Sequence, residues 1–293
     1  MTGRLIDMGG YRLHVTDRGS GGPAVVVLHG AGESSYSWFH VGKAVSGFTR
    51  IVTYDRPGLG ASDPGPGLDP VRSVEELDAV LAKAGVPAPY VLVGHSIGGI
   101  LARLYAIRYP ERVAGMVMVD SSHEALKDDP GFRKGFAMTA AVLKVMRALA
   151  RIGLPRFLIQ PLEFAMMYPE RRFYAGQISP GEYRDWAAAV HRNLTGTNGV
   201  QELGAAFPML EAAAAAKKDG QQFGSMPMVV LTNPGFGQAW IEMHRELAAR
   251  SANSVHRITD HKGHNIQMPR PELVIDAIRE VVEQVRDRVD KAI

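Results

Sequence analysis

The sequence predicts an α/β fold in which a mostly parallel, doubly wound sheet is interrupted by a helical insertion. Runs such as Ala24–Leu28 and Val113–Val119 are apolar at nearly every position, as in strands that are buried on both faces. Helical patterns alternate with these runs, which favours parallel strands joined by crossover helices. The strand signals stop at about residue 124 and resume after residue 223, so the insertion occupies the middle of the chain.

The first 120 residues contain the elements of a repeating βα pattern. Residues 4–7 and 11–17 flank Gly9 and Gly10 and predict an opening hairpin. A glycine-rich stretch at 19–23 then breaks the chain before the first apolar run. We expect two further buried strands, at 90–94 and 113–119, and two helices, at 73–84 and 97–109, the second ending before Pro110.

The remaining elements complete the sheet after the insertion. The insertion itself is rich in Ala, Met, Phe and Arg and has helical periodicity. Beyond it we expect a strand at 227–231, a helix around 241–250, a strand at 254–258 and a closing helix from 271 to about 288. The predicted organisation is therefore a core made of residues 1–123 and 224–293, with residues 124–223 as a helical cap.

The composition is that of a globular protein and excludes several classes of function. The 293 residues are 46% hydrophobic and 22% charged, and 33 basic against 30 acidic side chains give a net charge of +3. This charge is too balanced for electrostatic binding of nucleic acid. The absence of cysteine excludes disulfides, thiol nucleophiles and cysteine-ligated metals. Without a signal-peptide core or an apolar run of 18 residues, we expect a cytoplasmic protein with no integral membrane segment.

A nucleophile motif stands at the end of one predicted strand. Residues 94–99 read Gly-His-Ser-Ile-Gly-Gly and contain the pattern G-x-S-x-G between a strand and a helix. A strand-to-helix turn this tight needs small neighbours, because the backbone of the serine is strained. The turn holds the hydroxyl above the sheet edge, at a helix N-terminus whose dipole favours developing negative charge. Ser96 is therefore the predicted nucleophile.

At this motif the chain resembles the α/β-hydrolase superfamily. The resemblance extends to His29-Gly-Ala-Gly32 after the third strand, to the turn at 54–63, to residues 109–115 and to the segment that starts at Gly263-His264. It implies the α/β-hydrolase fold, with about eight strands and a helical cap, and it covers the core at both ends of the chain. The insertion matches only in being a helical cap.

The resemblance also implies the chain order serine, acid, histidine for a catalytic triad. A serine hydroxyl is a poor nucleophile at neutral pH and needs an adjacent base. Only His261 and His264 lie between the last strand and the last helix. His264 follows Gly263 at a spacing typical of the family, so it is the predicted base, with His261 as the alternative.

The acid is the less regular member of the predicted triad. Most of the superfamily carries it after the seventh strand, but residues 231–240 contain no carboxylate. Asn233 stands in that stretch, and because an amide cannot stabilise an imidazolium as an anion does, we expect mild effects from substitutions there. Some members, haloalkane dehalogenases among them, carry the acid after the sixth strand, where this chain has Asp120. Asp120 is the predicted acid and Glu124 the alternative.

Acyl transfer also needs two donors for the negative oxygen of the tetrahedral intermediate. The resemblance implies the backbone amides of Ile97, which follows the nucleophile, and Ala31, in the loop after the third strand. His29, Asp55 and Arg56 are expected to stabilise the neighbouring turns and not to react with substrate.

These residues predict a carboxylesterase-like serine hydrolase that acts on a small-molecule ester with an apolar acyl or alcohol part. An amidase, a lactonase, a C–C-bond hydrolase or a non-catalytic receptor of the same fold are the alternatives. Epoxide hydrolases and dehalogenases of the superfamily have aspartate where this chain has Ser96. The sequence has no nucleotide-binding glycine loop and no metal-ligand spacing, so neither cofactor nor metal is expected.

One helix of the cap is predicted to be amphipathic. On a helix spanning residues 132–151, Phe132, Phe136, Leu143, Met146 and Ala150 share a stripe, while Arg133, Lys144, Arg147 and Arg151 share another face. The stripe either packs as ordinary core or covers the pocket of Ser96 as a lid. Met138, Met146, Met166 and Met167 would suit a substrate-lining role, because thioethers adapt to varied shapes.

Overall fold

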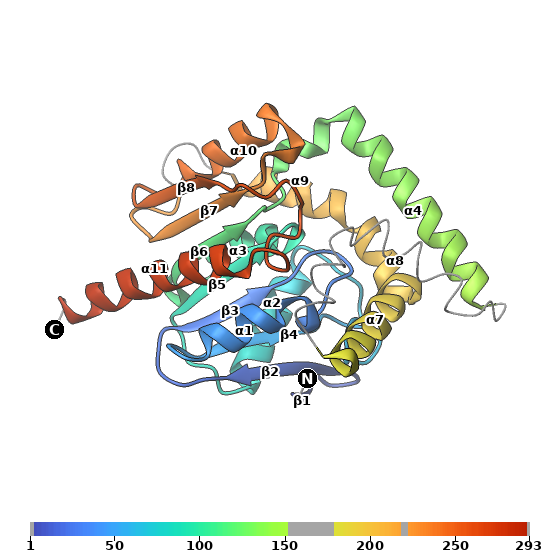
Figure 1. Cartoon of the computed structure of the whole chain (residues 1–293), viewed down its shortest axis with the longest axis horizontal. Helices are drawn as coiled ribbons and strands as arrows, with labels where there is room; N and C mark the ends of the chain where they lie inside the picture. The colour runs from blue at the N-terminus through green and yellow to red at the C-terminus, as the bar shows by residue number, and fades with distance from the viewer. Residues whose placement is uncertain (1–2, 152–178, 218–221, 292–293) are drawn as a thin grey trace.

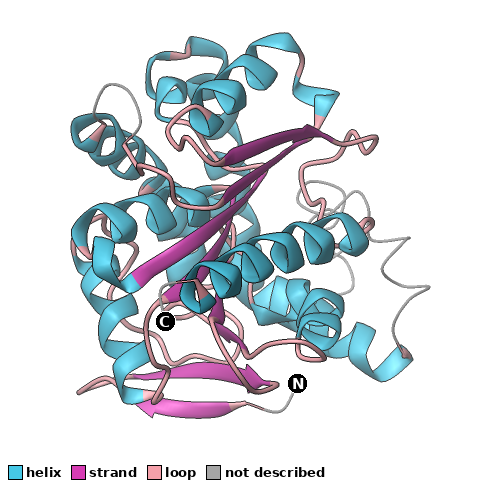
Figure 2. Cartoon of the chain, turned by 90° about the vertical axis from the view of Figure 1, so that its left-hand side faces the viewer, coloured by secondary structure: helices cyan, strands magenta, loops and turns pink. Residues whose placement is uncertain are grey.

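A computed structural model describes residues 3–151, 179–217 and 222–291 of the chain. Its centre is an eight-stranded sheet that twists between layers of helices (Figures 1 and 2). The strand order is β1 (Arg4–Asp7), β2 (Arg12–Arg18), β4 (Ile51–Tyr54), β3 (Ala24–Leu28), β5 (Tyr90–His95), β6 (Val113–Val119), β7 (Met228–Thr232), β8 (Ser254–Ile258). The β1–β2 and β2–β4 pairs are antiparallel and all other pairs are parallel, which confirms the predicted fold class.

The side chains of the parallel strands alternate between two apolar layers. Val25 and Val27 of β3 pack with α1 (Phe39–Val45) and α11 (Pro271–Asp290) on one face. Val26 and Leu28 face the other layer, which contains α2 (Arg72–Lys83), α3 (Ile97–Arg108) and α10 (Gln238–Ala248). Because both faces are covered, every position of such a strand must be apolar.

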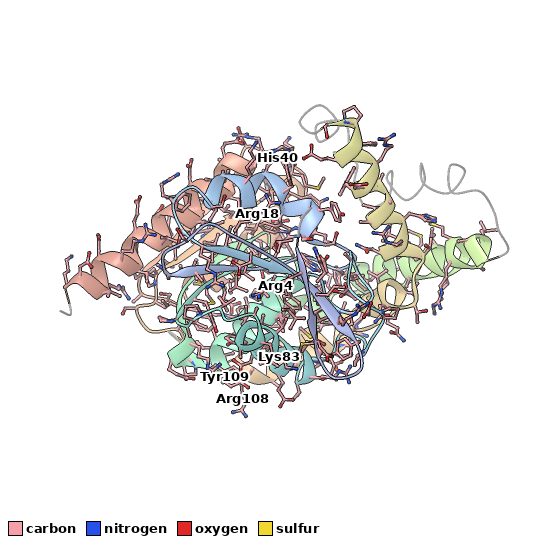
Figure 3. The ribbon with its side chains drawn as sticks, turned by 90° about the horizontal axis from the view of Figure 1, so that it is seen from below. Arg4, Arg18, His40, Lys83, Arg108 and Tyr109 are labelled. Atoms are coloured by element: carbon pink, nitrogen blue, oxygen red, sulfur yellow. The ribbon has the colours of Figure 1, made fainter. Side chains whose placement is uncertain are left out.

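Basic side chains connect the N-terminal hairpin of β1 and β2 to the end of helix α2. Lys83, at the end of α2, donates a hydrogen bond to the carbonyl of Asp7 at 2.7 Å, and Arg4 donates to the carbonyl of Ala84. Figure 3 shows Arg4 and Lys83 on this underside of the molecule. The antiparallel edge is thereby tied to a helix of the parallel core.

Residues 124–223 contribute a 3₁₀ turn and four described helices, α4 (Pro130–Arg151), α7 (Pro180–Thr195), α8 (Thr197–Gly204) and α9 (Ala206–Ala216). α9 packs on α3 through Met209 and Leu210, within the main core. α4 and α7 instead pack around a smaller apolar cluster, in which Leu143 and Met146 lie with Trp186 and with Leu203 of α8. α4 extends away from the sheet (Figure 1). The division into a core and a cap at residues 124 and 223 stays a prediction.

The carboxyl ends of β5, β6, β7 and β8 lie along one edge of the sheet, because these strands are neighbours and parallel. In open α/β sheets this edge is where sites are built. Every predicted catalytic residue follows one of these strands in the sequence. None of the described helices is both long enough and apolar enough to cross a membrane.

Candidate active site

Ser96 occupies the tight turn between β5 and α3. Its backbone has φ 52° and ψ −125°, a left-handed conformation that non-glycine residues rarely adopt. The turn needs glycine on both sides: a Cβ on Gly98 would lie 2.0 Å from the carbonyl oxygen of Leu28, and one on Gly94 2.5 Å from the Cα of Gly99. The G-x-S-x-G pattern therefore has a steric cause in this fold, and the serine is held in a strained backbone conformation.

The structure brings His264 and Asp120 into direct contact. His264 lies in the loop between β8 and α11, and Asp120 directly follows β6 with a positive φ of 42°. The Nδ1 atom of His264 is 2.6 Å from Oδ2 of Asp120. With a donated proton at Nδ1, the Nε2 atom of the ring is left as an acceptor. This is the tautomer that a general base needs.

The carboxylate of Asp120 is fully buried and accepts several hydrogen bonds. The backbone amide of Asn233 donates to it at 3.0 Å, the indole of Trp240 donates at 2.8 Å, and the Asn233 side-chain amide also donates. Burial acts to raise the pKa of Asp120, but the hydrogen bond and the charge of His264 outweigh it and hold the pKa below its ordinary value. The group is thus kept as an anion.

Two residues missed by the sequence interpretation surround the same carboxylate. Trp240 gave no signal because indoles in helices are usually core residues. Asn233 was considered only as a replacement acid, whereas its side chain is a partner of Asp120. The expectation of mild effects at Asn233 therefore no longer follows.

A cavity of about 550 Å³ lies against Ser96 and His264. Ala31 and Ile97, whose amides are the predicted oxyanion donors, also line it. The wall is largely apolar and comes from α3, α4, α8, α9 and α10, with Ile100, Phe132, Phe136, Leu203, Leu210, Trp240 and Met243 among its residues. The ionisable side chains of the described lining are Glu33, His95, Asp129 and His264.

Two of the four methionines expected to line the pocket, Met138 and Met146, do not line it. Met138 is 66% exposed, and Met146 is buried in the smaller apolar cluster between α4 and α7. Met166 and Met167 lie outside the described residues. Among the described residues, the methionine that lines the cavity is Met243 of α10, which the sequence pattern did not single out.

The loop at residues 29–33 carries the predicted oxyanion donor Ala31. The amide of Gly30 donates to Glu33 Oε2 at 2.9 Å, while Arg56 donates to the carbonyls of His29 and Gly30 at 2.7 Å each. No described residue accepts a hydrogen bond from the amide of Ala31. His29 and Arg56 thus stabilise the turn, as expected from the sequence, and the amide of Ala31 remains available to a ligand.

A buried Glu33–His95 pair joins this loop to the base, and the sequence interpretation missed it. His95 Nδ1 lies 3.1 Å from Glu33 Oε1, and His95 Nε2 lies 3.0 Å from the backbone oxygen of His264. Burial acts to raise the pKa of Glu33, but His95 and the amide of Gly30 lower it to about 2. Burial likewise acts to lower the pKa of His95, but Glu33 raises it. Each partner thus favours the charged form of the other, and the pair holds two loops of the site together.

The alternative acid and the alternative base from the sequence, Glu124 and His261, are not among the described residues that line the cavity. Glu124, the alternative acid, lies 2.7 Å from Arg103 and also contacts Arg250, so its charge is already compensated. Burial acts to raise the pKa of Glu124, but these arginines lower it to about 2.

The described residues contain one cluster with metal-ligand chemistry, formed by His123, Glu124 and Glu246. The guanidinium of Arg250 already lies among them, 3.1 Å from Glu246 Oε1 and 3.4 Å from His123 Nε2, and it also contacts Glu124. A cation of the protein thus occupies the place that a metal would take.

Comparisons with known proteins place these residues in a wider context. A family model described as the alpha/beta hydrolase family matches residues 25–277 of the chain. The 2-hydroxymuconate semialdehyde hydrolase of Pseudomonas putida is 32% identical over 190 residues, which are 64% of this chain and 65% of that protein. The chain spans only 17% to 39% of the length of three other curated relatives.

Two solved structures are similar over nearly their whole length. An esterase from Thermogutta terrifontis superposes with a TM-score of 0.67 at 22% identity, covering 97% of this chain and 99% of that one. The epoxide hydrolase of Bacillus megaterium superposes with a TM-score of 0.71 at 17% identity, covering 96% and 100%. At these identities the likeness concerns the fold.

Proposed function

Because the chain belongs to the alpha/beta hydrolase family and has its fold, we propose that it is a serine hydrolase that cleaves carboxylic esters through an acyl-enzyme. The observation that carries this proposal is a strained serine on the same cavity as an imidazole whose Nδ1 lies 2.6 Å from a buried carboxylate. This set of groups supplies a nucleophile, a base and the anion that stabilises the protonated base.

In the proposed mechanism Ser96 Oγ attacks the ester carbonyl and His264 Nε2 takes its proton. The negative charge of Asp120 stabilises the imidazolium that forms, and the amides of Ala31 and Ile97 donate to the oxygen of the tetrahedral intermediate. His264 then returns the proton to the leaving alcohol. A water molecule, activated by the same imidazole, releases the acid and regenerates Ser96.

The lining of the cavity favours an apolar, uncharged substrate. Aromatic and aliphatic side chains dominate the wall, and the carboxylate of Asp129 would repel an anionic acyl group, whereas the charge of Glu33 is balanced by His95. The named substrate of the Pseudomonas putida relative, 2-hydroxymuconate semialdehyde, carries a carboxylate. This difference is the reason to rank an ester above the C–C bond of that relative.

C–C-bond cleavage on the same triad is the second candidate, supported by the 32% identity to that hydrolase. An epoxide hydrolase is disfavoured, although one of the similar folds has that activity, because Ser96 stands where aspartate is the nucleophile in such enzymes.

The test is a substrate panel measured with the wild type and with Ser96→Ala. It contains p-nitrophenyl esters from acetate to palmitate, an anilide, a lactone, 2-hydroxymuconate semialdehyde and styrene oxide. We expect turnover of uncharged esters that disappears in Ser96→Ala, together with labelling of the wild type alone by a fluorophosphonate. Turnover of the semialdehyde without ester cleavage would replace the proposal by the second candidate, and no labelling at all would favour a non-catalytic receptor.

A further inference from the structure

Two residues from the helices of the insertion hold the loop that carries Ala31. Glu202 of α8 accepts a hydrogen bond from the amide of Gly32 at 2.8 Å. Asn193 of α7 donates from its side chain to the carbonyl of Gly32 at 3.0 Å. Both polar backbone groups of the residue next to Ala31 are therefore bound by side chains that lie more than 160 positions away in the sequence.

The same two side chains are anchored to the turn after β4, so they form a bridge. Glu202 makes a bidentate ion pair with Arg56, and Arg56 in turn donates to the carbonyl of Gly30 at 2.7 Å. Asn193 accepts from the amide of Gly60 at 2.8 Å. Asn193, Glu202 and Arg56 are all 2% exposed or less, so water does not compete for these bonds.

These bonds on either side restrict the orientation of the Ala31 amide. The amide of Gly30 is bound by Glu33 and the amide of Gly32 by Glu202, and the amide between them faces no described acceptor. A peptide whose two neighbours are fixed has little freedom to rotate, and donors that are held in place before the reaction stabilise an oxyanion best.

We propose that Asn193 and Glu202 are positioning residues of the oxyanion hole, through which the helices α7 and α8 fix Gly32 and thereby the amide of Ala31. The effect on catalysis rests on the proposed function, whereas the restraint of the loop does not. On this view the insertion is part of the machinery that stabilises the transition state, in addition to forming a wall of the cavity.

The test compares two variants with matched controls. Asn193→Ala removes both bonds without leaving a buried charge, and Asn198→Ala is its control, because Asn198 is equally buried in α8 but donates to the carbonyl of Gly65 at 2.9 Å. Glu202→Gln weakens the pair with Arg56 and is expected to lower stability. Glu124→Gln, which breaks the buried pairs with Arg103 and Arg250, is the control for that loss.

The first readout is the rate constant on p-nitrophenyl butyrate and on its thiono analogue, whose sulfur gains less from amide donors than oxygen does. We expect Asn193→Ala and Glu202→Gln to lower kcat on the oxygen ester roughly 10- to 100-fold with little change in KM. The rate constant on the thiono ester should fall much less, so the ratio of the oxygen-ester rate constant to the thiono-ester rate constant decreases. Asn198→Ala and Glu124→Gln should leave the ratio unchanged. An unchanged ratio in Asn193→Ala, or an equal fall in its control, would overturn the proposal.

The second readout is amide hydrogen exchange of peptides that cover residues 28–36, which requires no turnover. We expect faster exchange there in Asn193→Ala than in Asn198→Ala. If the wild type cleaves no ester, the proposed function fails, and this measurement still decides whether the helices restrain the loop. Equal exchange in the two variants would overturn the restraint whatever the enzyme's substrate.

Discussion

At the scale of single residues, Ser96, His264 and Asp120 were predictable because each is placed by a local feature of the sequence. Ser96 lies in a glycine-flanked turn, while Asp120 and His264 follow predicted strands whose ends share one sheet edge. Glu33, Asn193 and Glu202 could not be predicted in the same way. Their partners are set by tertiary contacts, and no periodicity or spacing encodes those contacts.

The proposed roles of Ser96 and His264 predict non-additive losses. Because nucleophile and base act as one unit, Ser96→Ala, His264→Ala and the double variant should each lower kcat by about 10⁶. The measurement is kcat on p-nitrophenyl butyrate for all three proteins. Losses that add in the double variant would show that the two residues do not act in one step.

The surroundings of Asp120 predict that its removal affects both catalysis and stability. Asp120→Asn should lower kcat by about 10⁴, because the amide cannot stabilise the imidazolium and favours the wrong tautomer of His264. Its NH₂ group would also face donors from Asn233 or Trp240, so the melting temperature should fall.

Asn233→Ala serves as the companion variant, since it removes one donor but leaves the carboxylate. It should reduce kcat far less than Asp120→Asn does. A kcat in Asp120→Asn within tenfold of the wild type would exclude Asp120 as the acid.

At the scale of elements, the strands and core helices follow closely from the sequence. The strands at 113–119 and 254–258 have their predicted bounds, and α3 begins at the predicted residue and ends one residue early. The periodicity of residues 132–151 also predicted α4 correctly as a helix. What periodicity could not tell is which part of its apolar stripe meets which neighbour, since a stripe has the same pattern against a core or against a cavity.

One part of the apolar stripe of α4 lines the cavity and another is buried against α7. Substitutions in the first part should therefore change substrate preference, and those in the second should change stability. Phe136 lines the cavity, whereas Leu143 and Met146 are buried against α7. Phe136→Ala should change the preference between short and long acyl chains. Leu143→Ala and Met146→Ala should lower the free energy of unfolding by about 2–5 kcal/mol and leave that preference unchanged.

Kinetics on p-nitrophenyl acetate and decanoate, with chemical denaturation of each variant, make this comparison. If Phe136→Ala affects both esters equally and only through stability, α4 is core packing and not a lid.

At the scale of the whole molecule, two buried carboxylates should make the fold sensitive to acid. The pKa values of Glu33 and Glu124 are lowered from 4.5 to about 2, so both groups bind protons more readily in the unfolded chain. Their contribution to stability is complete above pH 4.5 and is lost as the pH falls towards 2. Thermal unfolding measured from pH 7 to pH 2 should show a falling melting temperature in that window.

Glu124→Gln provides the matched comparison for this pH dependence. It should be destabilised by about 3–5 kcal/mol at pH 7, because Arg103 and Arg250 lose their buried partner. The deficit should shrink towards pH 2, where the wild-type carboxyl also becomes neutral. A deficit that stays constant with pH would mean that the charge of Glu124 is not what stabilises the fold.

Intact-protein mass spectrometry, after rapid mixing with p-nitrophenyl butyrate and acid quenching, shows whether Ser96 carries the acyl group during turnover. We expect a mass increase of one butyryl group, mapped by peptide sequencing to Ser96, and none in Ser96→Ala. We expect no adduct on this timescale in His264→Ala either, because the attack of Ser96 then lacks its base. An adduct on another residue, or ester turnover that persists in Ser96→Ala, would contradict this role of Ser96.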